Sequence, residues 1–184
     1  NRGHTAATIP LLTVRLPKST FLKKVRFFTL AEKTPISNDA GIISSGEVTV
    51  DGSGSIWTNS DGGLKVGYFG SGTLNVINGG AVVSSNGSVV IGDGNHSAGI
   101  VTVDGSGSTL TISRDLRIGY HAGTGVLNIT NGGAVIGEDA FIASELYTPD
   151  STGIVTVDGF GSTWIIGALT IGVILTWLLM GCWH

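Results

Sequence analysis

The chain has 184 residues, of which 41% are hydrophobic, 12% are charged and 30 are glycine. Glycine is therefore about twice as frequent as in an average protein, which favours a fold with many turns, while the count of only 4 prolines excludes collagen. The net charge of −3 provides no basic surface for nucleic acid, so no nucleic-acid partner is expected. The single cysteine excludes a disulfide framework and a multi-cysteine zinc site.

The first part of the chain differs in character from the rest. Residues 1–35 carry seven basic residues and one acid, whereas residues 36–184 carry three basic residues and 12 acids. Only one glycine, Gly3, comes before residue 36. We therefore expect a boundary near Thr34 and Pro35, with residues 1–35 as a leader that is poorly ordered or foreign to the rest. Basic residues interrupt the leader too often for a signal peptide, and a basic amphipathic membrane binder is the alternative.

A repeat occupies the chain from residue 36 to residue 172. The sequence of residues 48–55 recurs without change at 101–108 and with one change at 155–162. A weaker relative at 72–82 returns at 125–135. The repeat units are therefore 26–28 residues long, and odd and even units alternate. They begin at Gly46, Gly72, Gly99, Gly125 and Gly153.

Each unit reads as short strands joined by turns rich in glycine. Alternation of apolar and polar residues places the apolar side chains on one face of a strand. A single short strand cannot bury that face, whereas equivalent strands stacked in parallel can. The repeat therefore predicts an all-β fold, a parallel β-helix of about five coils with three strands per coil; a seven-strand sandwich is the alternative. One interior column should contain Val50, Val76, Val103, Ile129 and Val157.

The turns of odd and even units differ in charge. Each odd unit carries one turn acid, whereas the even units place Ile77 and Thr130 there, with Asn78 and Asn131 beside them. We expect this alternation to keep like charges about 10 Å apart in the stack, which weakens their repulsion. The residues expected to shape the turns are Asp51, Gly52, Gly54, Asn78, Gly79, Gly80, Asp104, Gly105, Gly107, Asn131, Gly132, Gly133, Asp158, Gly159 and Gly161.

The unit pattern G-x-V-T-V-D-G-x-G-S-x-W, L-x-V-G and G-x-L-x-V-x-N-G-G-x-V resembles a repeat of bacterial type V secreted proteins. Autotransporter passenger domains and some PEP-CTERM surface proteins share that repeat. The resemblance covers roughly residues 46–172 and is weak over 138–152. It implies a right-handed β-helical stalk, secreted to the surface of a Gram-negative cell and associated with the outer membrane. It also implies a translocating barrel in the parent protein, for which this chain has no room, and it supplies no catalytic residues.

The end of the chain departs from the repeat. Residues 173–184 are apolar and are expected to lie outside the repeat domain of residues 36–172. Residues 164–183 carry no charge and are long enough for a membrane helix, which is one alternative. Trp164, Leu169 and Ile171 nevertheless keep the repeat register, which favours a last coil followed by a foreign tail.

Candidate chemistry along the repeat is sparse. The irregular fourth unit provides a candidate contact loop with the side chains of Glu138, Asp139, Glu145, Tyr147 and Asp150. No spacing predicts a catalytic, cofactor-binding or metal-binding residue, and His96 and His121 are expected on surface turns. Trp57 and Trp164 could stack on sugars, but their repeated position favours packing.

The function expected from these observations is non-enzymatic. The chain would be a stalk or passenger segment that acts in adhesion or structural display, with a surface protein or glycan of a host or neighbouring cell as its partner. A β-helical polysaccharide lyase or hydrolase is the enzymatic alternative, and a cluster of acids or of Lys and Arg on one flat face would favour it. A surface protein anchored in the membrane through residues 164–183 is the third alternative.

Overall fold

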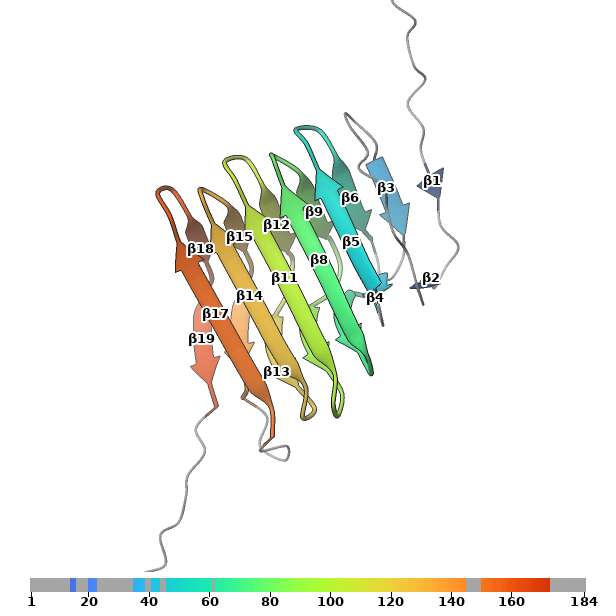
Figure 1. Ribbon diagram of the computed structural model, residues 1–184, viewed down its shortest axis with the longest axis vertical. Helices are drawn as coiled ribbons and strands as arrows, with labels where there is room; N and C mark the ends of the chain where they lie inside the picture. Colours follow the sequence, from blue (N-terminus) through green and yellow to red (C-terminus); the bar gives the residue numbers. More distant parts are fainter. Residues whose placement is uncertain are drawn as a thin grey trace, which may run out of the picture.

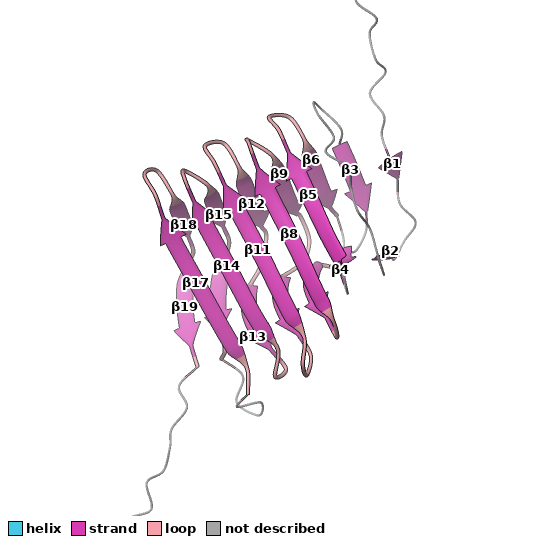
Figure 2. Ribbon diagram, viewed as in Figure 1, coloured by secondary structure: helices cyan, strands magenta, loops and turns pink. Residues whose placement is uncertain are grey.

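The computed structural model describes residues 14–15, 20–22, 35–38, 41–43, 46–60, 62–144 and 150–172, and every regular element in them is a strand (Figure 2). The strands form three sheets, and all pairings between neighbours are parallel. In each sheet the neighbouring strands of the repeat are three elements apart in the chain, so each coil contributes one strand to each sheet. This arrangement confirms the predicted parallel β-helix with three strands per coil.

Sheet A contains β1 (Val14–Arg15), β3 (Pro35–Asn38), β6 (Ile56–Asn59), β9 (Ala81–Ser84), β12 (Thr109–Ile112), β15 (Ala134–Ile136) and β18 (Thr163–Ile165). Sheet B contains β2 (Thr20–Leu22), β4 (Gly41–Ile43), β7 (Leu64–Tyr68), β10 (Val89–Asp93), β13 (Leu116–Tyr120), β16 (Asp139–Ile142) and β19 (Ala168–Ile171). Sheet C contains β5 (Gly46–Asp51), β8 (Ser71–Ile77), β11 (Ala98–Asp104), β14 (Thr124–Thr130) and β17 (Thr152–Asp158).

The strands of sheet C run side by side and carry the colours from cyan to red in Figure 1. We number the coils 1 to 5 by these strands, so that coil 1 is β5–β6–β7 and coil 5 is β17–β18–β19. Two further strands, β1 and β2, lie within the segment predicted as a leader and pair with β3 and β4. Apart from Pro35, which begins β3, the other residues of that segment lie outside the described part of the chain.

The core is the interior column that the repeat predicts. Val50 pairs with Val76, Val76 with Val103, Val103 with Ile129, and Ile129 with Val157. The first four are buried. Val157 is 47% exposed, because no described coil follows β17 to cover it.

A glycine near the end of three sheet B strands, β7, β10 and β13, changes which side chains face outward. Gly92 in β10 has φ +71°, and a Cβ there would overlap the carbonyl oxygen of Thr124 at the start of β14. Only glycine fits such a close approach of two backbones. Gly67 and Gly119 occupy the same position in β7 and β13. The left-handed backbone at these glycines interrupts the regular pleat, so the alternation of inward and outward side chains changes at the residue that follows.

The structure at the end of the described chain contradicts one alternative, the membrane helix over residues 164–183. Residues 164–183 do not form one membrane helix, because Trp164 lies in β18 and Leu169 and Ile171 lie in β19. Among the described residues no helix is long and apolar enough to cross a membrane. Residues 173–184, predicted as a tail, lie outside the described residues.

Candidate functional site

The predicted repeat turns form a ladder of hydrogen bonds at one corner of the solenoid. The side-chain amide of Asn78 donates to Oδ1 of Asp51 at 2.7 Å, and Asn131 donates to Oδ1 of Asp104 at 2.6 Å. Each bond joins an odd coil to the even coil that follows it. In the last described coil, Asp158 accepts instead from the backbone N–H of Gly159, at 2.8 Å.

Serine side chains complete this ladder, and sequence reasoning did not assign them a role. The hydroxyl of Ser108 donates to the backbone oxygen of Asp104 at 2.6 Å and accepts from the N–H of Gly79, one coil back, at 3.0 Å. Ser162 accepts in the same way from Gly132 at 3.1 Å. These side-chain bonds link each coil, from coil 1 to coil 5, to the next.

The turn glycines have conformations that explain their residue type. Positive φ values occur at the glycines that follow the turn acids and at the first glycine of each Asn-Gly-Gly turn. These residues are Gly52, Gly54, Gly79, Gly105, Gly107, Gly132, Gly159 and Gly161. The second glycine of the Asn-Gly-Gly turn lies against the preceding coil. A Cβ on Gly80 or Gly133 would overlap the carbonyl oxygen of Val50 or Val103, respectively.

The predicted contact loop is only partly described. Glu138 and Asp150 are exposed, and Asp139 accepts a hydrogen bond from the N–H of Ala168 at 3.0 Å. The carboxylate of Asp139 therefore ties coil 4 to coil 5. Glu145 and Tyr147 lie outside the described residues.

The tryptophans pack as predicted. Trp57 is buried in the core, and Trp164 is half-buried against it, with its indole Nε1 lacking a hydrogen-bond partner. His96 is exposed on its turn, in agreement with the prediction.

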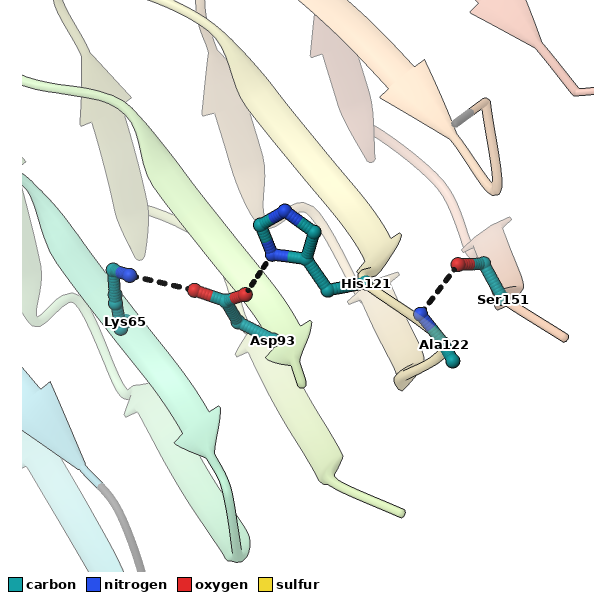
Figure 3. A network of polar contacts seen from close by, with 5 residues as sticks. All are labelled: Lys65, Asp93, His121, Ala122 and Ser151. Atoms are coloured by element: carbon teal, nitrogen blue, oxygen red, sulfur yellow. Dashed lines mark hydrogen bonds and ion pairs between the residues drawn. The ribbon is translucent and has the colours of Figure 1, made fainter. Parts of the chain in front are cut away.

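A site that the sequence did not predict lies on the outer side of sheet B. The side chain of Asp93 is only 3% exposed, and its Oδ2 lies 2.6 Å from Nζ of Lys65, one coil back. Its Oδ1 lies 2.9 Å from Nδ1 of His121, one coil on (Figure 3). Because an ionised carboxylate only accepts hydrogen bonds, Nδ1 of His121 carries the proton in this contact. Both oxygens of Asp93 are thus used to bridge three coils.

Two tyrosines flank Asp93 in the sheet. In the register of sheet B, Asp93 lies between Tyr68 and Tyr120. The ammonium group of Lys65 lies 4.3 Å from the ring centroid of Tyr68, and the guanidinium carbon of Arg117 lies 5.0 Å from that of Tyr120. Both distances are within the range of cation–π attraction.

Two further rings extend the cluster. The ring of Phe69 lies edge-on to that of Tyr68 at a centroid distance of 4.6 Å, and the ring of His121 lies 3.9 Å from that of Tyr120. We call this set the sheet B patch. It consists of Lys65, Tyr68, Phe69, Asp93, Arg117, Tyr120 and His121.

Each cation of the patch is paired with a carboxylate. Lys65 is paired with Asp93, and Arg117 is paired with Asp115 at 3.1 Å. The Lys65 and Arg117 side chains are both 34% exposed, so solvent screens these pairs from one side. Lys65, Asp93, Arg117 and the adjoining Asp115 together carry no net charge when His121 is neutral.

The patch also includes backbone strain. Phe69 and His121 occupy equivalent positions in coils 1 and 3 and have φ values of 48° and 49°. A bulky residue in this region costs about 1–3 kcal/mol relative to an extended conformation. Next to His121, Ser151 accepts a hydrogen bond from the N–H of Ala122 at 3.0 Å and so fixes the strained turn (Figure 3).

Sequence reasoning placed His121 on a surface turn but missed its partner. The four charged side chains here, Lys65, Asp93, Asp115 and Arg117, form two ion pairs, Lys65 with Asp93 and Arg117 with Asp115. Within the described ranges no group of three or more His, Cys, Asp and Glu side chains is placed to hold a metal ion.

Comparison with known proteins adds no further constraint on the site. No family model, no curated protein and no solved structure matches the chain.

Proposed function

We propose that this chain is a non-enzymatic segment of a β-helical stalk that is displayed on the outer surface of a bacterial cell and serves adhesion or structural display. Its resemblance to the repeat of type V secreted proteins supports this function. The single observation that carries the proposal is the regular bonding of coil to coil. Backbone pairing runs through seven strands of sheet A and seven of sheet B, and side chains add the corner ladder.

Such a structure suits a spacer. Each added coil lengthens a solenoid by about 4.8 Å, so a chain of many coils extends far from its attachment point. The stacking is local, because each coil contacts mainly its neighbours, and length can therefore grow without a larger core. The repeat domain is acidic, with three basic residues and 12 acids in residues 36–172, which favours a solvated surface.

Surface labelling of intact cells tests this function. Antibodies against the purified chain are applied to the bacteria that produce it, with a periplasmic protein as the control for leakage. We expect labelling of intact cells and loss of the label after treatment with external protease. Labelling that requires permeabilised cells would overturn the proposal.

A second candidate function is cleavage of a polysaccharide. The convergence of Lys65, Asp93 and Arg117 on sheet B favours it, because acid–base chemistry on a glycan needs such groups close together. Against it, Asp93 is buried and both of its oxygens are bonded, which leaves it poorly placed to exchange a proton with a substrate. Release of new reducing or unsaturated sugar ends from polysaccharides by the purified chain would establish the enzyme instead.

A further inference from the structure

We propose that the sheet B patch is a binding site for a neutral saccharide chain that lies along the solenoid axis. This inference deepens the proposed surface function by naming the partner's chemistry and the residues that bind it. The patch combines the two features that sugar recognition needs, which are flat aromatic rings and fixed polar groups. Rings attract the C–H groups of a sugar through their negative faces, and polar groups hold its hydroxyls.

The rings are repeated at a useful spacing. Tyr68 and Tyr120 are two coils apart in the register of sheet B, which corresponds to about 10 Å along the axis. This separation is comparable to the length of a disaccharide. Because Lys65 and Arg117 lie over the two tyrosine rings, alternate sugar units of an extended chain would contact the more exposed rings of Phe69 and His121 in the same two coils. Phe69 and His121 repeat the same spacing one residue further along. Phe69 is 67% exposed, and its ring lies against Gly94, whose missing side chain leaves room for it.

The polar groups of the patch are held in place before any ligand arrives. Asp93 fixes Lys65 and His121, and Arg117 is held by Asp115 with its guanidinium carbon 5.4 Å from the ring of Phe141. Side chains that are ordered in advance lose less entropy on binding. The planar guanidinium of Arg117 and the ammonium of Lys65 can donate hydrogen bonds to sugar hydroxyls.

The charge balance favours a neutral partner over an anionic one. The two cations of the patch are each paired with a carboxylate, so little positive potential remains for an acidic sugar. Residues 36–184 carry nine more acidic than basic residues, and this surplus repels polyanions. A polyuronate is therefore the matched negative probe.

The conformation of Phe69 is an independent reason to assign a ligand to this face. A large aromatic side chain at φ 48° is disfavoured, and the equivalent position in coil 2 is Gly94, with φ 110°. The ring is largely in water and contributes little burial in return. Contact of the Phe69 ring with a bound partner would offset the cost of this strained conformation.

Affinity electrophoresis of the purified chain tests the proposal directly. Native gels contain a soluble β-glucan, a mannan, a galactan or, as the anionic probe, polygalacturonate. We expect retardation in at least one neutral gel and none in polygalacturonate. No retardation in any neutral gel, or retardation by polygalacturonate alone, would overturn the proposal.

Variants locate the site. F69G removes the ring and also relieves the backbone strain, so it should fold at least as stably as the parent chain while binding about tenfold more weakly. F160S is the matched control, because Phe160 is fully exposed on the turn of coil 5 and its repeat equivalents are Ser53 and Ser106. R117A should weaken binding, whereas R114A, outside the patch, should not. Equal effects of F69G and F160S would place the binding elsewhere and refute the assignment.

These outcomes separate the site from the stalk. Binding by the purified chain does not depend on where the cell places it. If the chain is labelled at the cell surface but binds no neutral glycan, the binding site is refuted and the stalk proposal stands. If the purified chain binds a neutral glycan but is found only inside the cell, the stalk proposal is refuted and the binding site stands.

Discussion

Asn131 donates its side-chain amide to Oδ1 of Asp104 across the boundary between coils 3 and 4, at 2.6 Å. The pair repeats two coils earlier as Asn78 and Asp51, so each described even coil places a neutral donor against the acid of the odd coil before it. Like charges are therefore kept two coils apart, about 10 Å, as the sequence pattern predicts. The side-chain amide of Asn131 also contributes a hydrogen bond, in addition to the weaker repulsion between like charges.

Replacement of Asn131 by aspartate tests this alternation. N131D places a second carboxylate beside Asp104, and we expect a loss of about 1–2 kcal/mol of stability at neutral pH. Two carboxylates in contact share a proton, which raises the pKa of one of them in the folded state. The loss should therefore shrink as the pH falls through that raised pKa.

The control for N131D is N131G. Asn131 has φ 52°, which glycine adopts freely, so N131G removes the amide without adding strain or charge. Denaturant unfolding at several pH values measures both variants. An equal, pH-independent loss in N131D and N131G would contradict the charge argument.

The hydrogen bond from Thr130 makes the contribution of Asp104 to folding stability depend on pH. The hydroxyl of Thr130 and then the amide of Asn131 lower the pKa of Asp104 below its ordinary value of 3.8. A lowered folded-state pKa contributes stability that is present above the ordinary pKa and is lost as the pH falls through the folded value. The parent chain should thus lose part of its stability below pH 3.8.

T130I is the natural variant for this measurement, because coil 2 has Ile77 at the same position. We expect the pKa of Asp104 to rise toward its ordinary value and the loss of stability in acid to become smaller. Carboxyl NMR titration reads the pKa, and T102V controls for the removal of a threonine hydroxyl on β11. An unchanged titration of Asp104 in T130I would show that the hydroxyl bond does not matter.

The fold could be predicted because every coil repeats the same sequence pattern. Alternating aliphatic residues, glycine turns and a fixed step of 26–28 residues agree with one another, and the register follows once two units are aligned. The pairing of Val103 with Val76 and Ile129 is one result of this agreement. The exposure of Val157 could not be predicted, because it depends on what covers the last coil.

The sheet B patch escaped prediction because it departs from the repeat. Coil 2 has Asp93 where coils 1 and 3 have tyrosine, and its partners are 28 residues away in either direction. Strict alternation from Val66 would also turn Tyr68 inward, but the left-handed backbone at Gly67 changes the direction of the side chain that follows. Aligning odd and even units residue by residue would have placed Lys65, Asp93 and His121 in adjacent coils.

The buried carboxylate of Asp93 should matter more for stability than an exposed one. D93N keeps the shape of the side chain but removes the charge that Lys65 and His121 contact, and we expect a loss of about 2 kcal/mol. D115N removes the partner of Arg117, whose side chain is 30% exposed, and should cost less than about 0.5 kcal/mol. Thermal unfolding of the two variants at pH 7 compares them. Equal losses would mean that burial does not strengthen the Asp93 contacts.

Close approach of backbones makes some glycines far more sensitive than others. G92A should cost about 3 kcal/mol or more, since the added Cβ overlaps the carbonyl oxygen of Thr124 and φ is +71°. Gly52 also has a positive φ, of 91°, but the nearest atom to its Cβ is the hydroxyl of Ser55 at 3.9 Å. G52A should therefore cost only about 1 kcal/mol, from conformation alone. Similar losses in the two variants would show that φ, and not crowding between coils, makes Gly92 necessary.

The stacked core gives a final contrast between two leucines of one column. Leu116 in β13 pairs with Ala140, which pairs with Leu169 in β19. Leu116 is fully buried and Leu169 is 47% exposed at the end coil, so L116A should cost about 2–5 kcal/mol and L169A about 1 kcal/mol or less. Hydrogen exchange of the strand amides should show whether the damage stays local, because a solenoid couples each coil mainly to its neighbours. L116A should then open β10, β13 and β16 before β4 and β7. Uniform loss of protection along the chain would mean that the coils unfold as one unit, and a large loss in L169A would mean that the end coil is covered in solution.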